Sequence, residues 1–175
     1  MSPGKTVLAF ALGLAASVSV QAQGHGPHPR AQAAPQLSGL GTDHLVVTTT
    51  IPQAQAFFDQ GLRLLYAFNH QEARRAFREA ARLDPMLALA HWGEALTLAP
   101  NLNAPMSAEN ARLARAAILE AQRLRTHGGA MERLLIDALA KRFAANPAAP
   151  RKRLDTAYAD AMALAAAQYP DEPNV

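Results

Sequence analysis

The chain has 175 residues, of which 50% are hydrophobic, only 6% are aromatic and 40 are alanine. This composition favours helices packed through small side chains and disfavours a strand-rich fold. There is no cysteine, which excludes disulfides, thiolate metal sites and cysteine nucleophiles. The 17 basic residues exceed the 14 acidic ones by three and are spread along the chain, so we expect no nucleic-acid partner.

Residues 1–22 have the pattern of a secretory signal peptide. Lys5 supplies the positive start, residues 6–20 form an apolar stretch, and Val20-Gln21-Ala22 provides small residues at the cleavage point. The apolar stretch is shorter than the roughly 20 residues that span a membrane. We therefore expect cleavage near Ala22, a periplasmic or secreted location, and no stable membrane span.

Residues 23–50 are predicted to be a flexible leader. Their first part is rich in glycine, proline, histidine and glutamine and has no apolar period, which is typical of a segment without a fold. Residues 43–50 are β-branched, and we interpret them as an extended lead-in because no partner strand is evident.

From Pro52 onward the apolar period is helical, and residues 51–175 are predicted to form one all-α domain. Asn69 with Glu72 and, further on, Ser107 are typical helix caps, while prolines interrupt the period between helices. Six helices in three hairpins result. They are expected over residues 52–68, 69–83, 86–99, 107–125, 130–143 and 151–168.

The first hairpin carries small residues, one aromatic residue and a proline at the spacing of a 34-residue repeat over residues 54–87. The second hairpin opens in register, but its second half repeats the small–bulky–small pattern seven residues later than a perfect copy would. The third hairpin matches more loosely. The motif residues are Gly61, Ala73, Phe77, Ala80 and Pro85 in the first hairpin, and Ala95, Ala114, Ile118 and Ala121 in the second.

On these residues the chain resembles the tetratricopeptide repeat family. Residues 58–85 and 90–106 are similar to segments of bacterial exported tetratricopeptide proteins of uncharacterised role. Gln60 and Leu64 depart from the family pattern, which prefers leucine and tyrosine at these two positions. The resemblance implies stacked helix hairpins and an adapter or scaffold function, in which a peptide or protein segment binds in a concave groove.

In such a stack the first helix of each hairpin lines the groove. Trp92 is the candidate anchor for a ligand, although aromatic residues at helical spacing often belong to the core instead. Gln55 and Leu65 are expected on the same wall. The groove residues that we expect are Phe58, Leu62, Tyr66, Leu89, Trp92 and Leu96.

The six histidines show no HxxxH or HExxH spacing, so we expect no cofactor and no metal site in the helical domain. Cleavage after Ala22 would nevertheless leave Gln23-Gly24-His25 at the new terminus, where an amine, two amides and the His25 imidazole can chelate Cu(II) or Ni(II). A periplasmic copper or nickel handling protein is therefore an alternative function.

The carboxylate pairs Asp155 with Asp160 and Asp171 with Glu172 are interpreted as solvated helix faces or caps. Because there is also no phosphate-binding loop or nucleophile elbow, we expect no catalytic activity. A second alternative is a non-catalytic helical domain of a larger enzyme. The loop over residues 101–106 admits two interpretations, a functional insertion or an ordinary turn built on asparagine and proline.

The last predicted helix carries apolar residues that have no later helix to cover them, namely Ala161, Met162, Leu164 and Ala165. Repeat arrays usually need a terminal capping element. We therefore expect either further helix pairs after Val175 in a longer protein, or self-association through residues 151–168.

Overall fold

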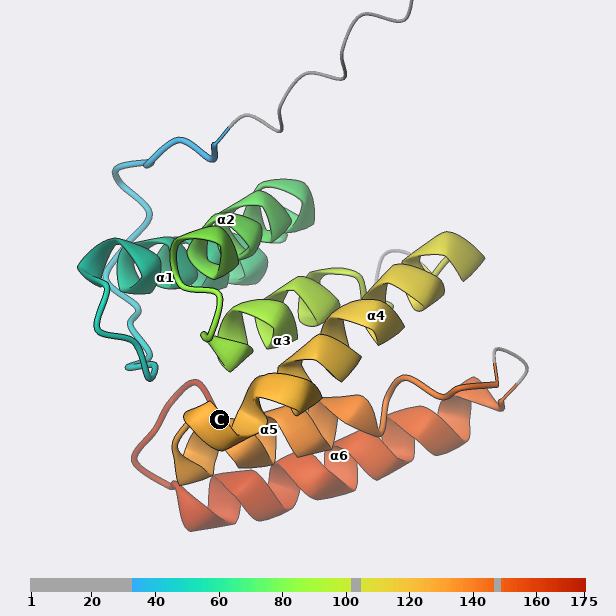
Figure 1. Ribbon diagram of the computed structural model, residues 1–175. Coiled ribbons are helices and arrows are strands. Elements are labelled where there is room, and N and C mark those ends of the chain that lie inside the picture. The colour runs from blue at the N-terminus through green and yellow to red at the C-terminus, as the bar shows by residue number, and fades with distance from the viewer. Residues whose placement is uncertain (1–32, 102–104, 147–148) are drawn as a thin grey trace, which may run out of the picture. The chain divides into compact units, whose positions relative to one another are not determined.

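The computed structural model describes residues 33–101, 105–146 and 149–175, and this part of the chain is all-α (Figure 1). It contains six α-helices, one short 3₁₀ helix and no β-strand, which confirms the predicted fold class at this level. The helices are α1 (Pro52–Tyr66), α2 (His70–Leu83), α3 (Ala88–Thr97), α4 (Ala108–Leu124), α5 (Ala130–Ala140) and α6 (Arg151–Gln168), with the 3₁₀ helix at Arg125–His127.

The helix ends follow local chemical signals. The Asn69 side chain accepts a hydrogen bond from the Glu72 N–H at 3.4 Å, and the Ser107 hydroxyl accepts one from the Asn110 N–H at 3.0 Å. We expected the first helix to reach residue 68, but it ends at Tyr66. Phe68 has a φ of 59°, a left-handed conformation that a helix cannot continue through.

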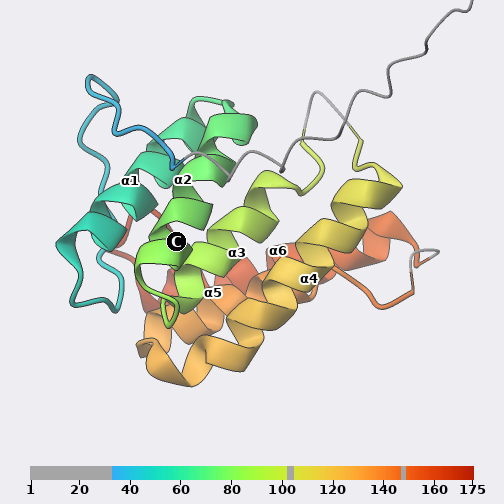
Figure 2. The ribbon, with the colours of Figure 1, turned by 45° about the horizontal axis from the view of Figure 1, so that its top comes forward.

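Each helix packs on the next one in the chain, and the first helices of successive hairpins also touch. α1 contacts α3, and α3 contacts α5, so these three helices form one layer of the domain (Figures 1 and 2). The buried apolar residues form one continuous core that extends from α1 to the end of α5. A single core of this kind joins the three hairpins into one folded body.

Phe77 of α2 lies at the centre of this core, wedged against two glycines. It is fully buried, and its ring meets the Phe58 ring edge-on with centroids 5.4 Å apart. A Cβ atom added to Gly61 would lie 2.8 Å from the Phe77 ring, and one added to Gly93 would lie 2.5 Å from it. α1 and α3 can therefore approach α2 this closely only because both glycines lack a side chain.

The remaining motif residues lie where helices meet, except for the proline. Pro85 is exposed in the turn after α2, beyond the C-terminal residue Leu83. Small residues at these positions allow close helix packing. The buried motif residues are Ala73, Ala80, Ala95, Ala114, Ile118 and Ala121, none more than 1% exposed.

Residues 33–50 do not behave as the flexible leader that we expected. Leu45 is fully buried and Val47 is 4% exposed, because the alternating side chains of an extended segment can enter the core from one side. Ala34 is buried as well, so the expectation of an unfolded leader is wrong for residues 33–42, whereas the alternating burial of residues 45–47 fits the extended lead-in predicted for residues 43–50. The predicted signal peptide over residues 1–22, its predicted cleavage point and His25 lie outside the described residues.

α6 packs against α5, and this contact covers part of the apolar face of α6. Ala165 is buried and Met162 packs against the core, contrary to the expectation that both need a further neighbour. Leu164 is 67% exposed. Self-association through this helix stays a prediction. None of the helices in the described part of the chain is both long and apolar enough to cross a membrane.

Candidate functional site

The residues predicted to line a groove lie mostly in the core. Phe58, Leu62, Leu89 and Trp92 are at most 3% exposed, so they do not line an open groove. The Trp92 indole N–H donates a hydrogen bond to the Leu135 carbonyl of α5 at 3.1 Å. The prediction failed because the apolar faces of the first helices of each hairpin pack on one another and on the second helices.

The other two predicted groove residues are more accessible. Leu96 is partly buried and packs against the core, whereas Tyr66 is half exposed. The Tyr66 hydroxyl donates a hydrogen bond to the Asn174 side-chain oxygen at 3.0 Å. Partial burial, with the nearby carboxylates of Asp43 and Glu172, raises the pKa of Tyr66. The tyrosine therefore stays neutral at physiological pH.

The polar side chains of α1 hold the lead-in by its main chain. The Gln60 amide donates to the Pro35 carbonyl at 2.9 Å and accepts from the Leu37 N–H at 2.8 Å. In an extended segment the carbonyl of one residue and the N–H two positions later point to the same side. One primary amide can therefore bind both groups, as a neighbouring strand would.

Gln55 repeats this arrangement on the next part of the lead-in. Its amide donates to the Leu45 carbonyl at 2.9 Å and accepts from the Val47 N–H at 3.0 Å. The two glutamines thus bind two stretches of main chain with the same pattern. We call the surface formed by Gln55, Asp59 and Gln60 the α1 clamp.

Asp59 completes the clamp with a buried carboxylate. It is 6% exposed and accepts hydrogen bonds from the His44 ring at 2.7 Å, the Leu45 N–H at 3.4 Å and the Gln55 amide at 3.1 Å. A buried carboxylate is stable only when donors surround it. The lead-in supplies two of these three donors.

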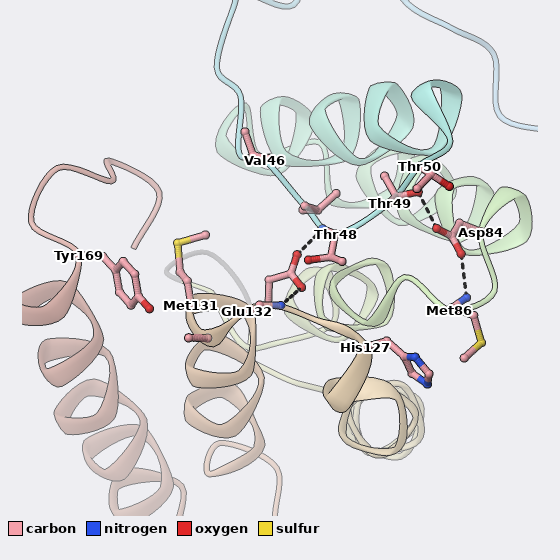
Figure 3. A pocket seen from close by; sticks show the side chains of 13 residues that line it. Val46, Thr48, Thr49, Thr50, Asp84, Met86, His127, Met131, Glu132 and Tyr169 are labelled. Carbon is pink, nitrogen blue, oxygen red and sulfur yellow. Dashed lines mark hydrogen bonds between the residues drawn. The ribbon is translucent and has the colours of Figure 1, made fainter.

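Beyond the clamp, two carboxylates fix the lead-in to the start of α5 and to the turn after α2. Glu132 accepts from the Thr48 N–H at 2.6 Å with one oxygen and from the Gly129 N–H at 2.9 Å with the other (Figure 3). Asp84 accepts from the Thr49 hydroxyl at 2.5 Å and from the Met86 N–H at 3.0 Å. Both carboxylates therefore serve as structural acceptors.

An open pocket of about 750 Å³ adjoins this end of the lead-in (Figure 3). It combines threonines with exposed apolar side chains, among them Val46, which is 69% exposed. The lining includes Val46, Thr48, Thr50, Met86, His127, Met131 and Tyr169.

The ionisable residues do not assemble a metal centre in the described part of the chain, where no group of three histidines or carboxylates could hold an ion. The two ring nitrogens of His70 are buried and have no hydrogen-bond partner there. A lone imidazole does not make a metal site. The candidate chelate at His25 lies outside the described residues.

His91 on α3 should make stability depend on pH. Burial lowers its pKa, against the opposing effect of Glu120 and Glu94. Below about pH 6.5, the pKa of histidine in an unfolded chain, the His91 imidazole binds a proton more readily in the unfolded chain than in the folded one. The free energy of unfolding therefore falls as the pH drops. We expect the melting temperature to fall between pH 7.5 and 5.5, and to fall less in a His91→Gln variant.

Thermal melts of both chains at these two pH values test this expectation. Melts at pH 7.5 and 8.5 serve as the control, because the His91 imidazole should be neutral in both states at both of these values. An equal fall in the two chains between pH 7.5 and 5.5 would contradict it.

Sequence reasoning placed Gln55 on the expected groove wall but did not predict that Gln55, Asp59 and Gln60 hold the lead-in, although a signal was present. Asp59 and Gln60 are polar residues that directly follow the apolar pair Phe57 and Phe58, and Gln60 stands where the tetratricopeptide pattern prefers leucine. Polar residues on a face that should be buried indicate either a partner segment or a ligand.

Comparison of the chain with protein-family models, with curated proteins and with solved structures gives no significant match.

Proposed function

We propose that the helical domain is a tetratricopeptide-like adapter of an exported protein, which binds an extended peptide segment of a partner and has no chemistry of its own. The stacking of consecutive hairpins supports the repeat assignment, because first helices contact one another while each helix packs on the next. The Phe77 wedge between Gly61 and Gly93 supports it too. The charged and apolar pattern of residues 1–22 supports export.

The observation that carries the peptide-binding proposal is the α1 clamp. Two glutamine amides already hold an extended main chain with both donor and acceptor, and apolar recesses take up Leu45 and Val47. Main-chain hydrogen bonds give affinity for any extended peptide, and recesses for alternate side chains give specificity. The described residues provide no comparable observation for copper or nickel handling, or for a domain of an enzyme.

Peptide selection tests the proposal. The mature chain, immobilised, is panned against a displayed library of unstructured peptides, and hydrogen–deuterium exchange then maps where an enriched peptide acts. We expect exchange to change at α1, at the start of α5 and in residues 33–50, with no change on the exposed side of α4. Scrambled versions of the enriched peptides are the control. Failure to enrich any peptide on this chain and on a folded Leu45→Ser variant, in which the lead-in is held less tightly, or a footprint confined to other elements, would refute the proposal.

A further inference from the structure

We infer that residues 35–47 are a built-in occupant of the peptide site, and that the partner is an extended peptide of the same pattern, with a side-chain donor followed by leucine, any residue and valine. This inference rests on the proposed function, because it names the ligand class and the regulation of the same surface. Three features of the lead-in support it.

The first feature is that the clamp recognises main chain. Gln60 and Gln55 bind the carbonyl of one residue and the N–H two positions later, at Pro35 and Leu37 and again at Leu45 and Val47. Every residue except proline carries both groups. Another extended segment can therefore make the same hydrogen bonds as the lead-in.

The second feature is the side-chain register. Leu45 is fully buried and Val47 is 4% exposed, while Val46 between them is 69% exposed. This alternation is that of a strand with one face on the protein. The His44 ring lies 2.7 Å from the buried Asp59 carboxylate. A competing peptide must supply the same donor, or Asp59 remains buried without it.

The third feature is the way the lead-in is attached. Gly39 and Gly41, with φ values of 78° and 89°, allow the chain to turn between the part held by Gln55 and the part held by Gln60. Residues 35–47 are thus a short strap joined covalently to α1. A tethered segment acts at a high effective concentration, so it excludes free peptides of similar affinity until it is weakened.

Substitutions in the strap separate its effect from that of the binding surface. In Leu45→Ser the strap loses its buried anchor, while the α1 clamp stays intact. Val46→Ser is the matched control, since that side chain is exposed in the same segment. The probe is a fluorescein-labelled peptide with the sequence of residues 33–50, titrated by fluorescence anisotropy with the mature chain.

We expect the Leu45→Ser chain to bind this peptide at least about tenfold more tightly than the unaltered chain or Val46→Ser, because apparent affinity scales with the fraction of open sites. A second peptide carrying Leu45→Ser should bind the same chain at least about tenfold more weakly than the first. Circular dichroism melts verify that each chain is folded. If Leu45→Ser unfolds, Leu37→Pro replaces it. Proline lacks the main-chain N–H that Leu37 donates to Gln60, and the Leu37 side chain that it replaces is 43% exposed.

The outcomes distinguish the two proposals. Equal affinity of the unaltered, Leu45→Ser and Val46→Ser chains for the peptide would refute the role of residues 35–47 as a built-in occupant, but it would not contradict the adapter function. Failure of every folded chain to bind the peptide would overturn the inferred ligand pattern. The adapter function itself would be refuted only if panning of both the unaltered chain and the folded Leu45→Ser chain also enriched no peptide.

Discussion

Replacing Gly93 by leucine should lower the free energy of unfolding by about 3 kcal/mol or more, because extra carbons in a filled core force side chains and helices apart. Even a single added Cβ would lie 2.5 Å from the Phe77 ring, which is enclosed on its other side by Gly61. Gly93→Ala should cost less, about 1–3 kcal/mol, since alanine gains about 1 kcal/mol in helix propensity.

Urea denaturation followed by circular dichroism measures both variants. Ala116→Leu on the exposed side of α4 is the control and should change stability by less than about 0.5 kcal/mol. Combining Gly93→Ala with Phe77→Leu gives a double-mutant cycle, in which the smaller ring-free side chain should relieve part of the cost. Strictly additive costs would contradict direct contact between Phe77 and position 93.

The helices could be predicted because their signals are local. Capping at Asn69 and Ser107 and the interrupting prolines are read from a few neighbouring residues, and the apolar period gives each buried face. The extent of α1 could not be predicted, since it depends on the left-handed conformation of Phe68. Nothing in the periodicity of a short segment reports that conformation.

The candidate site was harder to predict because burial is a property of the whole fold. Helical spacing places Phe58 and Trp92 on the inner side of the hairpins but does not tell whether a neighbour covers them. The lead-in posed the same problem, because Leu45, Val46 and Val47 are all apolar and the sequence does not show which of them is buried. Their partners turned out to be helix side chains, Gln55 and Asp59.

Gly93 illustrates a further limit of repeat reasoning. The 34-residue spacing from Gly61 points to Ala95, which is indeed fully buried. The close approach to Phe77, however, occurs two residues earlier, at Gly93. Sequence register identifies equivalent positions within hairpins, whereas the contact between neighbouring hairpins depends on how α3 lies against α2.

Trp92→Ala should destabilise the domain by about 3–5 kcal/mol, the usual cost of removing a large buried aromatic side chain. The indole is 3% exposed and its N–H binds the Leu135 carbonyl, so its removal opens a cavity between α3 and α5. From the sequence we expected Trp92 to anchor a ligand, in which case alanine would weaken binding and leave helicity intact. Because Trp92 lies in the core, we instead expect Trp92→Ala to lower the stability of the fold rather than to weaken ligand binding alone.

Trp92→Phe separates packing from hydrogen bonding. Phenylalanine keeps most of the apolar contact but lacks the N–H, so its cost should be well below that of alanine, with about 0.5–1.5 kcal/mol from the lost hydrogen bond. Urea denaturation by circular dichroism compares the three chains, and because the sequence contains one tryptophan, its fluorescence reports burial directly in the unaltered protein. If Trp92→Ala left the free energy of unfolding unchanged and weakened the binding of selected peptides, Trp92 would belong to the binding surface and not to the core. A large loss of stability in Trp92→Ala and a small one in Trp92→Phe would establish it as the packing contact that joins the second hairpin to the third.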